Sequence, residues 1–564
     1  MTPEFRILIV GGYGTFGGRL VELLENDARL TLLVAGRSLE QARTYCAKRS
    51  SAAATLVPTL FDRLNSDAKV LAQLRATIVV DASGPFQAYG DQRYSLIERC
   101  IKCGVNYLDL ADGSDFVSGV AKFDEAARSA GIYVLSGVSS FPVLTAAVVR
   151  HLSRDVALIT SIRGGIAPSP YAGVGVNVIR AIASYAGQPI ALKRGGKLVT
   201  AYPLTESIRF TIAVPGHVPL KNIRFSLVDV PDLRSLAEIW PQADDVWMGA
   251  GPVPAILHWL LAGFAWVVRL RLMPSLLWLA SAIYFVTNHV RWGEHRGGMF
   301  VEIRGKAADG STIKREWHLL AEGKDGPLIP SMAVEAIVRK SLSGQAPVPG
   351  ARTAISDVNL SEYQELFARR TIFTGVRQRE PIEGQPLFHH ILGEAWDILP
   401  LPIKQLHSIT SVSMYSGRCT VTQGSNPIAR AVTALVGFPR SGADLPIVVK
   451  LLAEGTGERW VRTVGNRTFS STQRLAKGRS EGLLSERFGI LAVDMALVFK
   501  GSNLTYVIRR WSLLGMPMPL WLGPKTTASE STDAQGRFCF DIKLWHPFIG
   551  LLVHYAGWLC RDDG

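Results

Sequence analysis

The chain has 564 residues, of which 48% are hydrophobic, and it carries a formal net charge of +14 and six cysteines. This length predicts about three domains, and six cysteines in so long a chain exclude a small disulfide-stapled fold. The positive excess lies beyond residue 150 and favours an anionic partner such as a lipid surface. We expect no nucleic acid partner, because no basic cluster alternates with stacking aromatic residues.

The first predicted elements are a strand, a glycine turn and a helix. Four apolar residues at 7–10 suit a buried parallel strand, and Gly12, Gly14 and Gly17 then fit the G-x-G-x-x-G pattern. In that pattern the first glycine makes the tight turn, the second lets backbone approach a pyrophosphate, and the third lets the helix pack closely. A second apolar run at 30–35 completes a β-α-β unit. We therefore predict a dinucleotide site at Gly11, Gly12, Tyr13, Gly14, Thr15, Phe16 and Gly17.

The tip of the second strand predicts which dinucleotide binds. NAD enzymes carry an acidic residue there for the ribose 2′-hydroxyl, but this chain has Arg37 and Ser38. A guanidinium beside a hydroxyl suits a 2′-phosphate, so we predict NADP rather than NAD. The alternative is that Arg37 is a solvated charge that only covers the adenine face.

The strand and helix alternation continues to about residue 150. A helix over 39–48 leads to a strand near 77–81, whose loop, Ala82, Ser83, Gly84 and Pro85, is predicted to lie beside the cofactor. Strands over 104–109 and 131–136 follow, and Tyr107 and Asp109 at the end of the first of them are our candidates for proton transfer.

Two other residue patterns in this region predict structure rather than chemistry. Asp109, Asp112 and Asp115 recur every three residues, which we interpret as a loop and a helix cap, so no metal site is predicted. Cys100 and Cys103 lie late in a predicted helix, where a redox pair would not have its thiol pKa lowered, and are interpreted as structural thiols.

Five motifs in combination resemble the saccharopine dehydrogenase-like family. They are Gly-Gly-Tyr-Gly-x-Phe-Gly at 11–17, Ala-Gly-Arg-Ser at 35–38, Ala-Ser-Gly-Pro-Phe at 82–86, Cys-Gly-Val-Asn-Tyr-Leu-Asp-Leu at 103–110 and Gly-Ile-Tyr-Val-Leu-Ser-Gly at 131–137. The resemblance implies an NADP-binding Rossmann domain and an inserted α/β substrate domain. Segments 293–299 and 327–350 also resemble the branch that contains saccharopine dehydrogenase-like oxidoreductases and trans-acting enoyl reductases.

One departure from the family bears on the substrate. Saccharopine reductases carry an acidic Asp-Pro-Gly pattern after the sixth strand, where this chain has Val-Ser-Ser-Phe-Pro at 138–142. Without that carboxylate a substrate ammonium loses its partner. An apolar or carbonyl substrate is therefore more plausible than saccharopine itself.

Residues 151–350 are predicted to form an α+β substrate or dimerisation domain, with strands over 158–166, 207–214, 299–303 and 313–320. Inside it, 253–292 contains two helices that are apolar on nearly all sides, separated by Arg269 and Arg271. Each is short for a bilayer, while Trp259, Trp266, Trp278 and Trp292 with Arg291 and Arg296 are residues that settle at a lipid interface. Three interpretations stay open: a patch lying on a membrane, an apolar substrate tunnel or homodimer core, and a hairpin through the bilayer.

The remaining chain is predicted to be a linker over 351–384 and a β-rich domain over 385–564. A helix over 387–399 precedes strands over 447–452, 460–464, 468–475, 490–499, 504–512 and 538–545. This part resembles a domain of unknown function that is often joined to such oxidoreductases, with Leu-Pro at 445–446, Glu-Arg-Trp at 458–460, Ser-Glu-Arg-Phe-Gly at 485–489, Pro-Met-Pro at 517–519 and Gly-Arg-Phe-x-Phe-Asp at 536–541. Glu458 with Arg459 and Glu486 with Arg487 are predicted to form cross-strand salt bridges.

The sequence thus predicts an α/β fold with a Rossmann-type parallel sheet over 1–150, an inserted α+β domain and a β-rich C-terminal domain. The function it favours is an NAD(P)H-dependent oxidoreductase that reduces a hydrophobic, lipid-derived carbonyl or enoyl substrate at a membrane surface. Glu294 and His295 are either a proton relay or a solvated turn. The first strand begins too early for a signal peptide, so we expect a cytoplasmic protein, peripheral on the inner membrane face. The alternatives are a non-catalytic membrane scaffold with a vestigial nucleotide fold and an amino-acid-type imine reductase.

Overall fold

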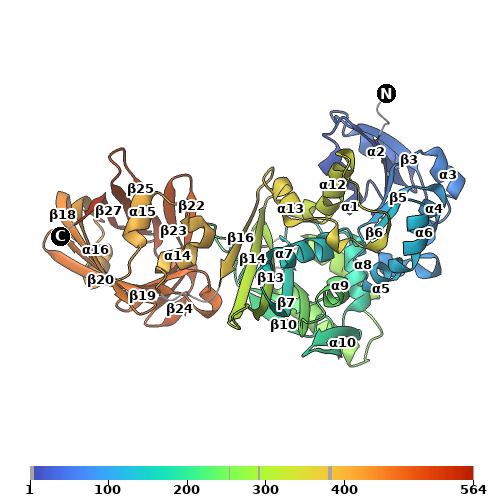
Figure 1. The fold of residues 1–564 in the computed structure, drawn as a ribbon. Helices are drawn as coiled ribbons and strands as arrows, with labels where there is room; N and C mark the ends of the chain where they lie inside the picture. The colour runs from blue at the N-terminus through green and yellow to red at the C-terminus, as the bar shows by residue number, and fades with distance from the viewer. Residues whose placement is uncertain (1–4, 253–254, 290–291, 379–383, 563–564) are drawn as a thin grey trace. The chain divides into compact units, whose positions relative to one another are not determined.

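The computed structural model describes residues 5–252, 255–289, 292–378 and 384–562 (Figure 1). Its chain divides into two compact units rather than following the predicted boundaries at 150 and 350. The N-terminal unit joins the residues up to Phe210 with Ile223–Phe373, so the predicted nucleotide and substrate domains lie in one unit. The C-terminal unit joins Thr211–Asn222 with Thr374–Gly564.

The first sheet of the N-terminal unit has the strand order β15-β6-β5-β4-β1-β2-β3 and is parallel, which confirms the Rossmann-type prediction. The central strand β1 pairs with both β2 and β4, and its Ile7, Leu8 and Ile9 are completely buried. The strands are β1 Phe5–Val10, β2 Leu30–Gly36, β3 Thr55–Leu60, β4 Ile78–Asp81, β5 Asn106–Asp109, β6 Tyr133–Ser136 and β15 Gly350–Thr353.

Helices connect these strands as a doubly wound sheet requires. They are α1 Thr15–Leu24, α2 Leu39–Ala47, α3 Ala68–Gln73, α4 Ser95–Cys103, α5 Ser114–Ser118, α6 Asp124–Ser129 and α7 Thr145–Leu152. Cys100 lies in α4, is fully buried and is unoxidised, and burial raises its pKa far above the ordinary value. This placement agrees with its interpretation as a structural thiol.

The predicted linker over 351–384 is wrong for most of its length. Strand β15 adds to the edge of the Rossmann sheet beside β6, and Ala351 is buried there. Helix α13 Leu360–Phe367 follows, with Tyr363 and Phe367 buried, and then strand β16 Ile372–Gln378. Residues 379–383 lie outside the described part of the chain. The prolines and glycines that suggested a linker mark a turn before β15.

The second sheet of the N-terminal unit is mixed and has the order β10-β11-β12-β7-β13-β14-β16. This confirms the α+β prediction for the region, although β10 ends at Phe210 because the next residues leave for the C-terminal unit. Its strands are β7 Leu158–Ala167, β10 Ser207–Phe210, β11 Ile223–Leu227, β12 Asp245–Ala250, β13 Arg296–Lys306 and β14 Thr312–Glu322; β8 Ile190–Arg194 and β9 Lys197–Ala201 form a separate hairpin. The helices are α8 Val176–Tyr185, α9 Asp232–Ile239 and α12 Ile329–Leu342.

The two predicted apolar helices are α10 Ala255–Arg269 and α11 Ala280–His289. One face is buried, because Ala265, Val268 and Ala280 pack with Ile179 and Ala183 of α8. The other face is exposed and apolar, and includes Ile256, Trp259, Leu260 and Phe285; Leu272 and Trp278, in the connection between the two helices, are exposed as well. No helix within the described residues has the length and apolar character needed to cross a bilayer. Arg291 lies outside the described residues.

The C-terminal unit is a ten-stranded antiparallel sheet that closes on itself. The order runs β22-β21-β20-β19-β18-β17-β27-β26-β25-β23, and β22 also pairs with β23. The strands are β17 Val412–Gln423, β18 Gly442–Glu454, β19 Gly457–Val464, β20 Arg467–Leu475, β21 Leu484–Phe488, β22 Leu491–Lys500, β23 Asn503–Leu513, β25 Lys525–Thr532, β26 Phe538–His546 and β27 Gly550–Arg561; the short β24 Met516–Met518 hangs on β23. The prediction missed β17, β21, β25 and β27.

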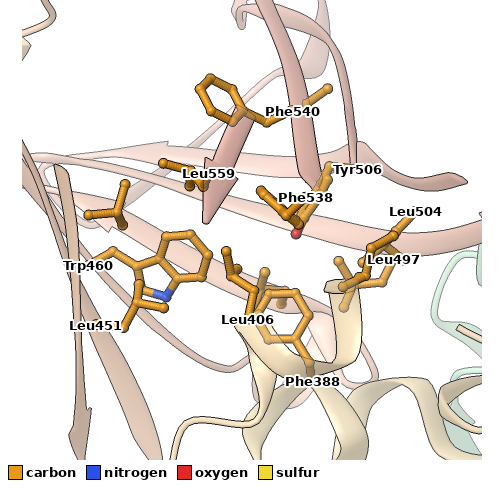
Figure 2. Packing of buried hydrophobic residues seen from close by; sticks show 14 of the residues in the cluster. Phe388, Leu406, Leu451, Trp460, Leu497, Leu504, Tyr506, Phe538, Phe540 and Leu559 are labelled. Carbon is orange, nitrogen blue, oxygen red and sulfur yellow. The ribbon is translucent and has the colours of Figure 1, made fainter. Parts of the chain in front are cut away.

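Helices close one end of this sheet. The predicted helix over 387–399 is interrupted at Gly393, which has φ of +51°, and leaves α14 Leu387–Leu392 followed by α15 Leu401–His407. Figure 2 shows Phe388 and Leu406 of these helices pointing toward Trp460, Tyr506 and Phe538 of the sheet. Between β17 and β18 lies α16 Pro427–Val436.

The predicted cross-strand salt bridges are present for Arg459 and Glu486. Arg459 Nη1 of β19 lies 3.8 Å from Glu454 Oε1 of β18, and Arg462 Nη2 of β19 lies 3.2 Å from Glu486 Oε1 of β21. Glu458 is buried and accepts a hydrogen bond of 3.1 Å from Trp460 Nε1. Glu458 and Glu486 belong to the inner face of the closed sheet, because strand residues alternate between its two faces.

Candidate cofactor site

A cleft of about 570 Å³ lies at the carboxyl edge of the Rossmann sheet, where such folds bind ligands. Its walls come from the ends of β1, β2, β3, β4 and β5 and from the start of α8. Most predicted cofactor residues line it, namely Gly11, Tyr13, Gly14, Thr15, Phe16, Arg37, Ala82, Ser83, Gly84 and Pro85. The lining does not include three predicted residues, Gly12, Gly17 and Ser38.

The glycines form a cradle that side chains would fill. Gly11 has φ of +80° and makes the tight turn, a role that the sequence pattern placed on Gly12. Gly12 instead packs against the sheet, where a Cβ would lie 2.9 Å from the Ile9 carbonyl oxygen. A Cβ on Gly17 would lie 2.2 Å from the Gly11 carbonyl oxygen, so this residue lets α1 approach the turn.

The start of α1 presents unused backbone donors to the cleft. Gly14 is the N-cap residue, and within the described chain no side chain caps this helix. Its own N–H donates to the Gly11 carbonyl oxygen over 2.8 Å. The first N–H groups of a helix lack intrahelical acceptors and carry partial positive charge, so they suit a phosphate.

Arg37 and Ser38 have separate roles at the tip of β2. Arg37 is exposed and lines the cleft, as predicted. Ser38 instead caps α2: its Oγ accepts from the Gln41 N–H over 3.3 Å, and its own N–H donates to Tyr13 Oη over 3.0 Å. Of these two residues, only Arg37 belongs to the lining of the cleft.

Asp62, which the sequence reasoning missed, faces Arg37 across the cleft wall. Its carboxylate accepts from the Leu64 N–H over 2.9 Å and from Asn65 Nδ2 over 2.8 Å. These hydrogen bonds, with Arg37 as a smaller cause, hold the pKa of Asp62 below its ordinary value.

A buried network around Asp81 holds the loop after β4 in place. Arg63 Nε lies 2.9 Å from Asp81 Oδ2, and Ser83 Oγ donates to Oδ1 over 2.5 Å. Tyr89 Oη is 2.7 Å from Ser83 Oγ, and the Arg63 guanidinium lies 3.5 Å from the centre of the Tyr89 ring. The pairing between Arg63 and Asp81 joins the ends of β3 and β4, which the sequence pattern did not indicate.

Helix α8 is tied to the same loop. Asn177 Nδ2 donates to the Gly84 carbonyl oxygen over 2.9 Å and to that of Ser83 over 3.2 Å. The substrate region of the N-terminal unit therefore contributes directly to the cofactor cleft. The buried face of α10 and α11 packs on this helix.

Tyr107 and Asp109 do not reach the cleft. Both are completely buried, and Asp109 Oδ1 accepts from the Gly137 N–H over 2.8 Å, the Ala111 N–H over 3.0 Å and Ser136 Oγ over 3.0 Å. Burial raises the pKa of Asp109 to about 7 and that of Tyr107 well above its ordinary value. In this structure the two predicted proton-transfer residues occupy structural positions that join β5 to β6.

Asp112 is the carboxyl group of this loop that lines the cleft. Its Oδ1 accepts from Gln87 Nε2 over 3.1 Å. Burial chiefly, and Asp229 to a smaller extent, raises the pKa of Asp112 despite that hydrogen bond. Asp229 itself accepts from Ser114 Oγ over 2.8 Å. The raised pKa means that the protonated form of Asp112 is more favoured than in an exposed aspartate.

The comparisons with known proteins agree with this geometry. Residues 7–135 match the family model described as the saccharopine dehydrogenase NADP binding domain. This segment is similar to that family of nucleotide-binding domains. Residues 399–559 match a domain of unknown function, DUF4166. No curated protein matches the chain.

Two solved structures that the chain matches are dehydrogenases. Apo saccharopine dehydrogenase (L-Glu forming) from Saccharomyces cerevisiae is 14% identical, with a TM-score of 0.48, and the match covers 66% of this chain and 99% of that one. The WlbA dehydrogenase from Thermus thermophilus, solved with NAD and α-ketoglutarate, is 12% identical, with a TM-score of 0.28, and the match covers 65% of this chain and 93% of that one.

A second, apolar pocket of about 250 Å³ adjoins the cleft at the edge of the Rossmann sheet. Phe16, Gly175 and Val178 line both spaces. Its further lining is mostly apolar and includes Ile166, Met299, Leu319, Ile329 and Pro330. Ser140, from the loop that replaces the acidic family pattern, also lines it.

The predicted relay of Glu294 and His295 is engaged in local contacts. His295 stacks on Tyr171 with ring centres 3.6 Å apart, and Glu294 accepts from Arg296 Nε over 2.9 Å. Neither residue is part of the lining of the cleft or of the apolar pocket. This favours the interpretation as a turn.

Proposed function

We propose that the N-terminal unit is an NADP(H)-dependent oxidoreductase. The observation that carries this proposal is one cleft that combines a glycine cradle, the free donors of α1 and an exposed Arg37. The backbone at 11–16 would hold the diphosphate, Arg37 the 2′-phosphate, and the loop at 82–85 the nicotinamide end. When bound, the nicotinamide supplies or accepts a hydride.

The substrate we propose is hydrophobic, with a carbonyl or an enoyl group. The apolar pocket that shares Phe16, Gly175 and Val178 with the cleft supports this proposal, since it would bury an apolar chain next to the cofactor. Asp112 is positioned to give a proton to the reduced substrate, because it lines the cleft and its pKa is raised. It takes the role that the sequence analysis expected of Asp109.

Action at a membrane surface is part of the proposal. Its support is the exposed apolar surface formed by α10, α11 and the connection between them, which carries Trp259, Leu272 and Trp278. Tryptophan and leucine on the outside of short helices are the residues that enter the boundary between headgroups and acyl chains. Helix α8 connects these helices to the cleft, so a substrate taken from the bilayer would have a short path.

The cofactor proposal is tested by replacing Arg37. Arg37→Ala should weaken NADPH binding about tenfold or more, because a hydrogen bond to a charged group is worth about 1.5–3 kcal/mol, and should leave NADH binding nearly unchanged. The measurement is calorimetric titration with both dinucleotides. Arg43→Ala, an exposed cation on α2, is the matched control and should change neither affinity.

Two results would contradict the proposal. Equal losses of NADPH and NADH affinity in Arg37→Ala would show that this residue does not read the 2′-phosphate. Absence of binding of either dinucleotide to the unaltered protein would favour the scaffold with a vestigial nucleotide fold.

A further inference from the structure

The closed sheet of the C-terminal unit encloses a cavity of about 390 Å³. Protein interiors pack densely and hold few voids larger than one water molecule. In liquid water, one molecule occupies about 30 Å³. A space this size falls in the range of small-molecule sites, and closed sheets with many strands commonly hold ligands inside. The lining is mostly apolar and includes Val449, Val493, Met495, Ile508, Ala528 and Phe540.

The two ends of this cavity differ. At one end α14 and α15 pack into the sheet, where Phe388 and Leu406 are completely buried. At the other end lie α16 and the connections after β21, β23 and β26. Leu435 of α16 and Ile490 line the cavity, yet they are 76% and 45% exposed. The cavity therefore reaches the surface at this second end.

An apolar rim surrounds that opening. We define the rim as the exposed residues Ile428, Leu435, Ile490, Leu514, Met516, Leu520, Trp521 and Phe548, all of which lie on α16 or on the connections of that end. Exposed cations lie at the same end, namely Arg430, Arg440, Arg487 and Lys525. An apolar rim among cations suits contact with the surface of a bilayer.

One wall of the cavity is polar. Gln473 of β20 pairs in register with Glu458 of β19 and Glu486 of β21, so the three side chains form a row on the inner face. Gln473 is 3% exposed and lines the cavity, and its Oε1 accepts no hydrogen bond in the described chain. A buried carbonyl oxygen without a donor is costly, so this atom points to a ligand that donates.

The two carboxylates that line the cavity, Glu486 and Glu530, already have hydrogen-bond partners. Arg462 donates to Ser471 Oγ over 2.8 Å and to Glu486 Oε1 over 3.2 Å. Glu530 accepts from Tyr506 Oη over 2.7 Å and lies 2.7 Å from His407 Nε2. A ligand carboxylate would meet Glu486 and Glu530 without a free cation in the described lining, whereas a neutral donor would complete the row.

We propose that the closed sheet binds one neutral long-chain apolar molecule that ends in a hydroxyl group. The chain would fill the apolar part of the cavity, and the hydroxyl would donate to Gln473 Oε1. The molecule enters from a lipid bilayer that the rim contacts. This site is separate from the nucleotide cleft and does not depend on the function proposed for it.

The binding test uses two fluorescent probes that differ in one group, parinaryl alcohol and parinaric acid, with the full-length protein. The alcohol should bind saturably with one molecule per chain, and at pH 8 the acid should bind at least about tenfold more weakly. Ala528→Phe fills the cavity and should abolish binding. The thermal unfolding midpoint shows whether this variant is folded.

A pair of variants on β20 tests the assigned end group. Gln473→Leu should weaken alcohol binding about threefold to tenfold, because one net hydrogen bond of about 0.5–1.5 kcal/mol is lost. Thr472→Val, on the outer face of the same strand, is the control and should bind as the unaltered protein does. Equal affinity for acid and alcohol, or alcohol binding that survives Ala528→Phe in a folded protein, would overturn the proposal.

The source of the ligand is tested by transfer. Leu435→Ser with Trp521→Ser should slow uptake of the alcohol from phosphatidylcholine vesicles about tenfold, yet leave equilibrium affinity for alcohol dispersed from ethanol unchanged. Equal uptake rates from vesicles would overturn the bilayer as the source. A loss in both assays would place these residues in the site itself and overturn their role as a rim.

Discussion

At the scale of single residues, the position of a side chain relative to the strand end decides its role. Tyr107 and Asp109 are on β5 itself, and the neighbouring strands and covering side chains leave both completely buried. Asp112 comes after the strand, where the loop turns over the edge of the sheet into the cleft. The rule that strand ends line the crevice was correct for the region, but it selected residues within the strand instead of residues beyond it.

We predict that Asp112→Asn lowers kcat by about a hundredfold or more, because it removes a proton donor. With the best substrate from a panel of long-chain ketones and enoyl esters, reduction by the unaltered enzyme should slow as pH rises through the raised pKa of Asp112, and the variant should lack that limb. NADPH affinity should not change. Asp115→Asn, at an exposed position on α5 three residues after Asp112, is the control.

Asp109→Asn should instead change stability. The pKa of Asp109 is about 7 in the folded protein against 3.8 as its ordinary value, so its contribution to stability is fully present below pH 3.8 and is lost as pH rises through about 7. The variant should lose less stability than the unaltered protein between pH 5 and pH 8, with a difference on the order of 2–4 kcal/mol in urea unfolding. A hundredfold fall in kcat with unchanged NADPH affinity would return Asp109 to a catalytic role.

At the scale of elements, local sequence patterns predicted a strand or helix well where most of its residues are apolar. Strands β1, β2, β4, β5 and β6 and helix α10 appear within a few residues of their predicted bounds, whereas β3 was not predicted and α11 is shorter than the predicted apolar run. Strands of the closed sheet such as β17 and β25 were missed, because their alternating exposure mixes apolar and polar residues in short runs. The role of Ser38 was also not predicted, because Ser38 is the N-cap of α2.

For α10 and α11 we predict that Trp259→Gln with Leu272→Gln and Trp278→Gln reduces binding to anionic vesicles by at least about tenfold. Burying one large apolar side chain is worth about 1.5–3 kcal/mol, so losing three should be evident in a flotation assay. Leu198→Gln on β9, where the residue is 77% exposed, is the matched control. Equal flotation of both variants and the unaltered protein would exclude these helices as the membrane contact.

At the scale of the whole molecule, the two units are not consecutive in the chain. Residues Thr211–Asn222 leave the N-terminal unit between β10 and β11 and pack within the C-terminal one. There the Phe499 N–H donates to the Gly216 carbonyl oxygen over 3.0 Å, and Arg509 Nη2 donates to that of Pro219 over 3.3 Å. Val218 packs beside Ala476, Leu483 and Ala496.

We therefore predict that one cut between the units does not separate them. A protease site inserted after Gly384 should yield two fragments that elute together in size-exclusion chromatography, because the first fragment keeps residues 211–222 seated in the second. The fragments should part only in denaturant. Separation in native buffer would contradict this account. The control is a chain cut in the same way after Ser343, which lies within the N-terminal unit.

The sequence by itself determined the features whose parts are neighbours along the chain: the strand, glycine turn and helix at 7–24, the cation at 37 and the apolar helices within 253–292. Only the tertiary structure decided the return of β15 to the Rossmann sheet, the pairing of Arg63 with Asp81, the exclusion of Asp109 from the cleft and the closure of β22 on β23 around a cavity. The physical reason is that these features join residues far apart in sequence or depend on what covers a side chain. Their energies arise from packing and burial that no local pattern carries.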